Sequence, residues 1–317
     1  MEKMKEFISK LEDLMPAKEL MFESTPSFGY YRPFLEHAVA HPAKMNTKLL
    51  EFLIRKFTKP GDIVLDPMAG TASTGVVAAL NGRNAICVEL EEKFYRWMEK
   101  ARENVEKTVT FTPKGWIKNI CGDARYLSDL LSRVIQHRTE DCGKSEDIGD
   151  LPFVDSIITS PPYERSETIH KRQGQDAKYF DKIGGIRHFK KETFSNKNNI
   201  GNLEKKAYLD AMLKVYTEMW KVLKPDGLAI VVIKPFVRNK KVVDLPYHTW
   251  LLLKKVGFKL YKLYKLRLKQ QSFWRILYEK KYPSTPKLRH EYVVVVKKHM
   301  CNRFLTKQVN RNHKSQK

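Results

Sequence analysis

Four residues, Ser160-Pro161-Pro162-Tyr163, are the part of this sequence that most clearly predicts chemistry. They follow a largely apolar run, residues 154–158, which predicts a buried parallel strand. Proline fixes φ and has no N–H, so the backbone carbonyls of this corner are free to accept hydrogen bonds. Ser160 adds a further acceptor and Tyr163 offers a flat face, so the corner could hold a planar ring whose exocyclic amine is to be alkylated. The same tetrapeptide is also compatible with a turn that carries no chemistry.

A second group of polar residues stands at the ends of three earlier strands. Residues 66–74 connect the first of these strands to its helix, and Gly70 lets a ligand approach the backbone closely. The loop has neither Gly-Lys-Ser/Thr nor three spaced glycines, which excludes a P-loop and a dinucleotide fingerprint. Asp66 suits an amine, Glu89 could accept hydrogen bonds from two ribose hydroxyls, and Asp123 could accept one from an adenine amine. The three acids predict a pocket for a nucleoside with an amino-acid-like tail, such as S-adenosylmethionine. The alternative is three solvated surface acids.

Alternating strands and helices must position these residues. A helix with one apolar face is predicted over residues 1–20, and another over 46–57 with Asn46 or Thr47 as its cap. The predicted strands are 62–65, 85–88, 117–121, 154–158, 228–233, 258–269 and 292–297. The further predicted helices are 74–81, 91–106, 127–135, 205–223 and 248–256. A turn over residues 224–227 ends the fourth of these helices, and Gly257 ends the fifth. This alternation predicts a doubly wound sheet with helices on both faces, the last two strands forming an antiparallel pair at one edge. Ligands of such sheets bind beyond the carboxyl ends of the strands.

Composition narrows the choice of partners. The chain of 317 residues has 59 Lys and Arg against 36 Asp and Glu, a formal net charge of +23. Such an excess favours nucleic acid as partner, then an anionic membrane surface, although general solubility also explains it. No apolar run is long enough to span a bilayer, and the first six residues are not a secretory signal. The four cysteines have no paired-ligand spacing. We therefore expect a cytoplasmic protein without a metal site.

The segments outside the sheet are rich in Lys and Arg. Residues 164–204 have few apolar side chains and are interpreted as a basic insertion that binds the target, with a merely solvated loop as the alternative. Residues 1–40 are expected to pack on a main domain of residues 41–300, and residues 301–317 to form a disordered basic tail. The candidates for contact with a nucleic-acid backbone are His170, Lys171, Arg172, Arg187, His188, Lys190 and Lys191.

The two motifs together resemble those of a known family. Asp66-Pro67-Met68-Ala69-Gly70-Thr71, followed by Thr159-Ser160-Pro161-Pro162-Tyr163, is similar to the paired motifs of the amino-methyltransferases of nucleic acids, the N4-cytosine/N6-adenine group. The resemblance covers roughly residues 40–300 and includes residues 41–44, 60–65 and 223–227. It implies the α/β, Rossmann-like fold of class I methyltransferases, a seven-stranded, mostly parallel, doubly wound sheet with an antiparallel edge strand. It also implies S-adenosylmethionine as cofactor.

The resemblance assigns roles to residues as well. The catalytic residues that it implies are Ser160, Pro161, Pro162 and Tyr163. The cofactor-binding residues are Asp66, Pro67, Ala69, Gly70, Thr71, Glu89, Asp123, Asn46 and Thr47, with residues 41–47 closing over the methionine end of the cofactor. A serine in the first position of the catalytic motif usually goes with cytosine N4, and Asp or Asn with adenine N6. Two features depart from the family: the cofactor motif precedes the catalytic one, unlike in many N4-cytosine DNA enzymes, and Ala72 replaces a common glycine.

The predicted reaction is a direct methyl transfer to an extruded base. The target cytosine leaves its stack, Tyr163 stacks on the ring, and Ser160 and the Pro161 carbonyl accept hydrogen bonds from the N4 amine. No covalent cysteine intermediate is expected. Because no sizeable recognition domain is evident, structured RNA such as ribosomal RNA is slightly favoured over DNA. The alternatives are a site-specific DNA N4-cytosine or N6-adenine methyltransferase, a non-catalytic nucleic-acid-binding protein on this scaffold, and a small-molecule methyltransferase, which the net charge disfavours. The oligomeric state stays open.

Overall fold

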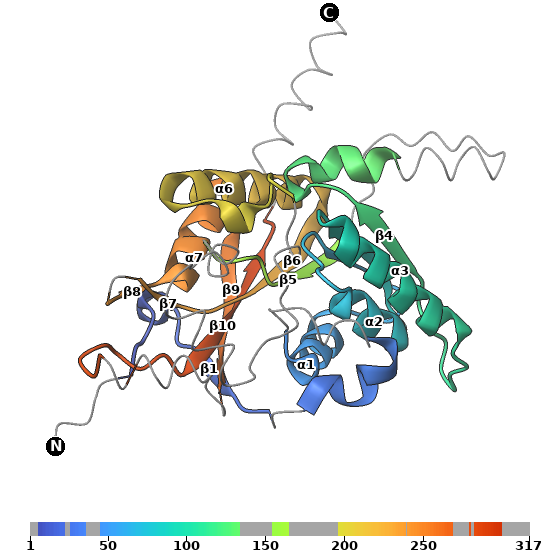
Figure 1. The fold of residues 1–317 in the computed structure, drawn as a ribbon, viewed down its shortest axis with the longest axis horizontal. Coiled ribbons are helices and arrows are strands. Elements are labelled where there is room, and N and C mark those ends of the chain that lie inside the picture. Colours follow the sequence, from blue (N-terminus) through green and yellow to red (C-terminus); the bar gives the residue numbers. More distant parts are fainter. Residues whose placement is uncertain are drawn as a thin grey trace, which may run out of the picture.

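An eight-stranded sheet forms the centre of the protein (Figure 1). The computed structural model describes residues 6–22, 26–35, 45–133, 154–164, 196–238, 240–268, 279 and 282–299. The strand order is β1-β9-β10-β6-β5-β2-β3-β4. The strands of this sheet are β1 (Lys18–Leu20), β2 (Ile63–Asp66), β3 (Asn84–Glu89), β4 (Ile117–Cys121), β5 (Val154–Thr159), β6 (Leu223–Ile233), β9 (Lys259–Arg267) and β10 (His290–Lys297). Two short strands, β7 (Phe236–Arg238) and β8 (Lys241–Val243), form a separate antiparallel pair.

The strand directions confirm the predicted doubly wound, mostly parallel sheet. Strands β4, β3, β2, β5 and β6 are all parallel to their neighbours. β10 is antiparallel both to β6 and to β9, so it is the one reversed strand of the sheet. The predicted antiparallel pair at the end of the chain is therefore present, with β10 between β6 and β9.

The edge of the sheet corrects the prediction of a helix over residues 1–20. In the described part of this segment, a 3-10 turn η1 (Lys10–Asp13) precedes β1, which adds an eighth strand parallel to β9. Ile8 and Leu14, two residues of the predicted apolar face, are 62% and 56% exposed. Pro16 interrupts the helical pattern because it cannot donate the hydrogen bond that a helix interior needs. The free edge of β9 then supplies backbone partners to residues 18–20.

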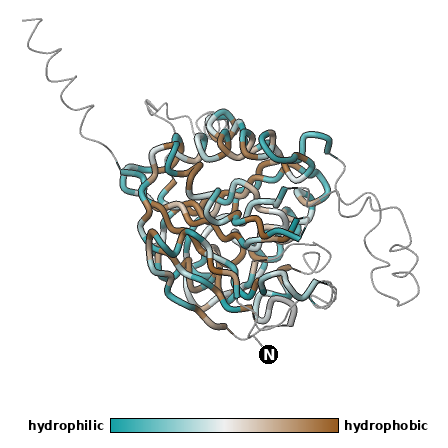
Figure 2. The backbone as a smooth tube through the Cα atoms, turned by 90° about the vertical axis from the view of Figure 1, so that its left-hand side faces the viewer, coloured by the Kyte–Doolittle hydropathy of each residue, from teal (hydrophilic) through white to brown (hydrophobic). Residues whose placement is uncertain are grey.

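Helices cover both faces of the sheet. The helices are α1 (Thr47–Phe57), α2 (Ser73–Leu80), α3 (Glu92–Lys107), α6 (Lys205–Val222) and α7 (Leu245–Val256), with 3-10 turns η2 (Pro26–Phe34), η4 (Ala124–Tyr126) and η6 (Ile200–Asn202), and residues 127–133 are also helical. One apolar cluster joins α1, α2 and α3 to the sheet, and another joins α6, α7 and residues 127–133 to it. Neighbouring residues Val64 and Leu65 of β2 belong to different clusters, as expected for a strand buried on both faces. Apolar segments accordingly run through the middle of the molecule (Figure 2).

The predicted turn over residues 224–227 takes another form. β6 follows α6 directly, pairs Leu223 with Val154 of β5, and resumes pairing with Leu228 opposite Ser156. Residues 224–227 therefore bulge out of the β5 ladder, and Asp226 has a φ of 61°. The turn-forming residues are accommodated within a strand because β10 pairs with β6 from Leu228 onward.

Local end signals were predicted well. Asn46 caps α1, since its Oδ1 accepts hydrogen bonds from the backbone N–H groups of Lys48 and Leu49 at 2.9 and 3.1 Å. Gly257 ends α7 with a φ of 119°. Asp244 caps the start of α7, which begins three residues before the predicted start at 248. The predicted tail over 301–317 lies outside the described residues.

Candidate functional site

The candidate site lies where the chain order of the sheet reverses. β3 and β4 lie on one side of β2, while β5 and β6 lie on the other (Figure 1). Because these strands are parallel, their carboxyl ends meet at one edge of the sheet. Asp66 ends β2, Glu89 ends β3, and Ser160 directly follows β5. The two motifs that are 94 positions apart in the sequence, counting from Asp66 to Ser160, therefore stand on adjacent strands.

Asp66 is a buried carboxylate whose two oxygens each accept a hydrogen bond. Its Oδ2 accepts a hydrogen bond from the Thr74 hydroxyl at 2.6 Å, and its Oδ1 accepts one from the Met68 N–H at 3.2 Å. Burial raises the pKa of Asp66 to about 6, and the hydrogen bonds from Thr74 and the Met68 backbone oppose the rise. Since β2 pairs with β5, Asp66 at the end of β2 stands beside the strand that leads into Ser160.

Glu89 holds the loop that follows β2. Its Oε2 accepts a hydrogen bond from the Gly70 N–H at 2.8 Å, and its Oε1 accepts one from the Glu91 N–H at 2.9 Å. Burial raises the pKa of Glu89 to about 7, and the nearby carboxylates of Glu91 and Asp66 add to the rise. Each carboxylate oxygen keeps lone pairs beyond these bonds, so Glu89 can still accept hydrogen bonds from a pair of ribose hydroxyls.

The loop between β2 and α2 uses two left-handed residues. Gly70 has a φ of 57° and Ala72 a φ of 61°, so Ala72 adopts the conformation that the family's glycine would favour. The substitution therefore keeps the backbone path at the cost of local strain. Pro67, Ala69 and Thr71 of the same loop are buried.

Gly75 is a residue that the sequence analysis missed. A Cβ at this position in α2 would lie 2.7 Å from the Cys87 Sγ and 3.4 Å from a methyl group of Ile117. The glycine therefore allows α2 to pack close against β3. The sequence could have indicated this role, because a glycine inside a predicted helix usually allows close packing against a neighbouring element.

Asp123 and the start of α1 are already engaged in local contacts. Asp123 caps η4 and forms an ion pair with Arg125 at 2.5 Å, leaving only its remaining lone pairs for an adenine amine. The Oδ1 of Asn46 is used to cap α1, and Thr47 is buried. Asp123 and Asn46 therefore act as helix caps, and the predicted contact of Asp123, Asn46 and Thr47 with the cofactor stays a prediction. His41-Pro42-Ala43-Lys44 lies outside the described residues.

The corner that follows β5, Ser160–Tyr163, is braced by α6. The Tyr208 hydroxyl of α6 is buried and donates a hydrogen bond to the Pro162 carbonyl at 3.0 Å. Ser160 and Tyr163 are half-buried. Burial raises the pKa of Tyr163 well above its usual value, and the backbone of Lys234 hydrogen-bonds to its hydroxyl. Of the two proline carbonyls, Pro162 therefore has an internal partner.

A buried contact joins this site to the segment that leads into α6. Glu91, at the start of α3, is 2% exposed and accepts a hydrogen bond from the Asn199 side-chain amide at 2.8 Å. The Asn196 N–H also donates to Glu91, and Arg125 donates to the Asn198 carbonyl at 2.9 Å. The segment is thus held by neighbours of Glu89 and Asp123. Sequence reasoning missed Glu91 because its partners are distant in the chain.

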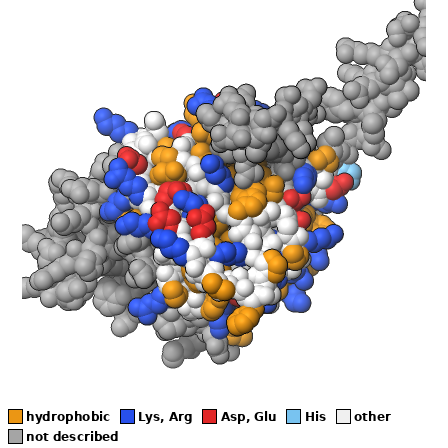
Figure 3. Space-filling view, turned by 90° about the vertical axis from the view of Figure 1, so that its right-hand side faces the viewer, with side chains coloured by type: hydrophobic (Ala, Val, Ile, Leu, Met, Phe, Trp, Pro, Cys, Tyr) orange, Lys and Arg blue, Asp and Glu red, His pale blue; other side chains and the backbone are white. Residues whose placement is uncertain are grey.

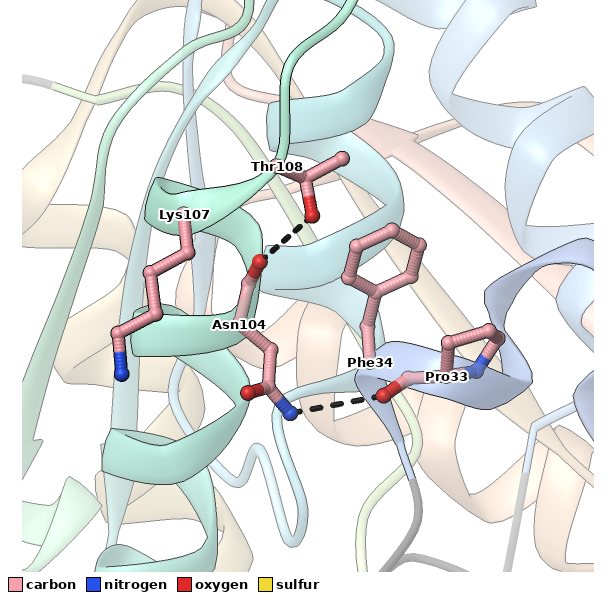
Figure 4. A pocket seen from close by; sticks show the side chains of 5 residues that line it. All are labelled: Pro33, Phe34, Asn104, Lys107 and Thr108. Carbon is pink, nitrogen blue, oxygen red and sulfur yellow. Dashed lines mark hydrogen bonds between the residues drawn. The ribbon is translucent and has the colours of Figure 1, made fainter.

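Other features of the described structure do not form a second reaction centre. A pocket of about 350 Å³ lies between η2 and the end of α3, lined by Pro33, Phe34, Asn104, Lys107 and Thr108 (Figure 4). Its polar groups bond to one another: the Asn104 amide donates to the Pro33 carbonyl at 3.5 Å and the Thr108 hydroxyl to the Asn104 carbonyl at 2.8 Å. The described residues contain no cluster of three or more His, Cys, Asp or Glu that could bind a metal.

Neither the described cysteines nor the described helices suggest a further function. Cys87 is buried, and burial raises the pKa of its thiol, which keeps it in its neutral form. Within the described ranges, no helix has the length and apolar character to pass through a bilayer. All seven residues proposed for backbone contact, from His170 to Lys191, lie outside the described residues.

Comparisons with known proteins agree with the geometry. Residues 23–100 match a family model for N6/N4 methyltransferases, described as DNA methylase. The chain is 40% identical over 67 residues to Type II methyltransferase M.HinfI of Haemophilus influenzae, which is 21% of this chain and 19% of that protein. It is 46% identical over 69 residues to the putative methylase YubD of Escherichia coli K12, 22% of this chain and 30% of that protein. The chain thus spans less than a third of the length of the curated relatives it matches.

The chain is also similar to solved structures. TrmN from Thermus thermophilus is 17% identical, with a TM-score of 0.45, and the match covers 84% of this chain and 53% of that one. The sequence match over residues 23–100 includes the loop after β2 and the end of β3, where Asp66, Gly70 and Glu89 lie. The predicted family and its cofactor, S-adenosylmethionine, are therefore confirmed. Over this matched segment, the chain is similar to the N4-cytosine/N6-adenine methyltransferase family, the family that its sequence motifs predicted.

Proposed function

We propose that this protein transfers a methyl group from S-adenosylmethionine to the N4 amine of cytosine in nucleic acid. The observation that carries the proposal is the adjacency of β2 and β5, which brings the Asp66–Gly70 loop and the Ser160–Tyr163 corner to one edge of the sheet. A methyl donor held by the Asp66–Gly70 loop and an amine held by the Ser160–Tyr163 corner can then meet in line.

The cofactor side of the site is assigned to residues of the first three strands. Glu89 accepts hydrogen bonds from the ribose hydroxyls, and the backbone of Gly70 and its loop lies against the nucleoside. Asp66 faces the amino group of the methionine part, and Asp123 the adenine amine. The residues present fit this cofactor because Glu89 is a half-buried acceptor fixed by two backbone N–H groups. The bound cofactor supplies an electrophilic methyl group.

The catalytic side is assigned to the corner after β5. Ser160 and the Pro161 carbonyl accept hydrogen bonds from the N4 amine, which directs the nitrogen lone pair out of the ring. Tyr163 stacks on the extruded base. Tyr208 fixes the Pro162 carbonyl, so the corner keeps its shape when the base arrives. No residue of this scheme forms a covalent bond with the base.

The choice of cytosine rests on Ser160. In the resemblance described above, a serine at the first position of the motif goes with cytosine N4, and Asp or Asn with adenine N6. A serine hydroxyl can accept a hydrogen bond and also donate one, which an ionised carboxylate cannot do. Adenine N6 is the alternative acceptor that the family allows.

The nature of the polymer has two candidates, each with its own observation. The net charge of +23 and the lack of an evident recognition domain favour structured RNA. The description of the matched family as DNA methylase favours DNA. The matched segment lies in the cofactor half, so it does not by itself select the polymer.

One experiment tests the function and separates these candidates. The purified protein is incubated with S-adenosylmethionine carrying an isotope-labelled methyl group and, in separate arms, with unmodified ribosomal RNA and genomic DNA. Nucleoside mass spectrometry should find labelled N4-methylcytosine in one arm. Labelled N6-methyladenine would contradict the choice of base, and no labelled nucleoside together with cofactor binding by calorimetry would favour a binding module.

A further inference from the structure

The β7–β8 pair is a basic and aromatic element next to the catalytic corner. It follows β6 after only Lys234 and Pro235, so it begins at the carboxyl edge of the sheet (Figure 1). Arg238 of β7 forms an ion pair at 2.7 Å with Glu164, the residue after Tyr163. The Glu164 side chain is only 8% exposed, so this pair ties the hairpin firmly to the corner. The sequence analysis assigned no function to this element.

Cations and aromatic rings alternate along this element. The Lys234 Nζ lies 5.9 Å from the centroid of the Tyr163 ring. The Arg238 guanidinium lies 5.1 Å from the Phe236 ring, and the Lys240 Nζ lies 4.9 Å from the Tyr282 ring. Three cations therefore rest on three rings, beginning at the ring assigned to the target base.

Two of the lysines have no acidic partner. Lys240 and Lys241 are exposed, and none of the described residues forms an ion pair with either. The nearest acid in the sequence, Asp244, is engaged by the Ser9 hydroxyl at 2.7 Å and the Lys10 N–H at 2.8 Å. Within the part of the chain that the structure describes, the hairpin therefore presents positive charge that no carboxylate neutralises.

The opposite case is seen on α3. Figure 3 shows the side of the molecule on which α3 lies, where Asp and Glu side chains gather among Lys and Arg. Here Arg96 pairs with Glu92 at 2.5 Å, and Arg102 pairs with both Glu99 and Glu106 at 3.0 and 2.6 Å. Arg96 and Arg102 of α3 thus have acidic partners, unlike Lys240 and Lys241 of the hairpin.

We propose that the β7–β8 hairpin binds the single-stranded part of the nucleic acid that flanks the target base, an inference that rests on the proposed function. Lys240 and Lys241 neutralise backbone phosphates, and Phe236 and Tyr282 offer faces on which unstacked bases can lie. A nucleic-acid strand whose target base stacks on Tyr163 would reach the hairpin directly, because the Arg238–Glu164 contact joins the hairpin to the residue that follows Tyr163. A lipid surface fits less well, since Val237, Val242 and Val243 of the hairpin are half-buried, whereas Lys240 and Lys241 are its exposed residues.

The test compares two double variants with the same change in charge. Lys240→Ala with Lys241→Ala removes the hairpin cations. Lys254→Ala with Lys255→Ala removes two exposed lysines from the last turn of α7, at the opposite edge of the sheet. Binding of a fluorescein-labelled, mixed-sequence single-stranded oligonucleotide is followed by anisotropy over a range of salt concentrations, with RNA and DNA probes of the same sequence. Calorimetry with S-adenosylmethionine checks the cofactor site of each variant.

The outcomes separate the inference from the function on which it rests. The hairpin variant should bind the oligonucleotide about tenfold more weakly, and the slope of log K against log salt should fall by about 1.4, the value for two phosphates of a single strand. The α7 variant should keep the wild-type slope. If both variants bind as the wild type does, the hairpin assignment is wrong while the proposed function stands. If the wild type binds cofactor but neither oligonucleotide, both are wrong.

Discussion

The side-chain amide of Asn199 donates a hydrogen bond of 2.8 Å to the buried carboxylate of Glu91, although 108 residues separate them. Glu91 also donates its own N–H to Glu89, the residue assigned to the cofactor ribose. The segment that leads into α6 is therefore anchored beside Glu89, at the proposed cofactor site. Since α6 carries Tyr208, this anchor also stands at the start of the element that braces the catalytic corner.

Glu91→Ala should destabilise the fold by about 2 kcal/mol, because it leaves buried donors of Asn199 and Asn196 without an acceptor. Urea unfolding measures the loss. Glu92→Ala is the matched control: its carboxylate is 69% exposed and pairs only with the exposed Arg96, so the expected change is below about 0.5 kcal/mol. Equal losses in the two variants would show that the anchor contributes nothing beyond a surface ion pair.

Tyr208→Phe should lower turnover on the order of tenfold without changing cofactor affinity, since it frees the Pro162 carbonyl and loosens the corner that orients the base. Tyr216→Phe is the control, because Tyr216 is also buried in α6 but its hydroxyl bonds to Thr249. Both variants lose one buried hydrogen bond, about 1 kcal/mol of stability. Steady-state kinetics would contradict the bracing role if Tyr216→Phe slowed the reaction as much as Tyr208→Phe.

Tyr163→Ala and Glu89→Ala should have opposite effects. The first should lose most turnover and keep cofactor binding, because it removes the stacking face for the base. The second should raise the Kd for S-adenosylmethionine, because it removes the acceptor for the ribose hydroxyls. Calorimetry and single-turnover kinetics separate the two. Wild-type turnover in Tyr163→Ala would make the catalytic assignment wrong.

Cofactor affinity should depend on pH around neutrality. Burial raises the pKa of Glu89 to about 7, so the carboxylate becomes protonated as the pH falls through that value. Since the ribose hydroxyls prefer an ionised acceptor, the Kd for S-adenosylmethionine should rise below pH 7 and level off above it. Calorimetry between pH 6 and pH 8 measures this, with Glu89→Gln as the variant that has lost the titrating group. A wild-type Kd that is constant over this interval would contradict the role of Glu89.

The same pKa values predict the stability of the free protein. Glu89 and Asp66 hold protons in the folded state, up to about pH 7 and about pH 6, that the unfolded chain has already released. The unfolded state then binds fewer protons, so the free energy of unfolding falls as the pH rises from the ordinary carboxyl pKa toward 7. Thermal unfolding of the free protein should show this decrease. Asp66→Asn should reduce it because asparagine does not titrate, and the variant keeps the loop in place because its amide oxygen can still accept a hydrogen bond from the Met68 N–H.

The amino-acid sequence by itself determined the strands and helices of the core and the polar residues at the strand ends. Continuous apolar runs specified β2, β3, β5 and β6, because strands buried on both faces need them. Caps such as Asn46 and Gly257 marked helix ends through local hydrogen bonds and backbone conformation. The resemblance of the motifs at Asp66 and Ser160 then predicted the family that the comparison confirmed.

Tertiary structure alone decided the pairings between distant parts of the chain. Residues 18–20 form a strand because the edge of β9 is free, and residues 224–227 bulge because β10 continues the pairing of β6. The contacts Glu91–Asn199 and Tyr208–Pro162 join residues that no local pattern relates. The raised pKa of Glu89 has the same origin, since it comes from burial by neighbours that only the assembled sheet brings together.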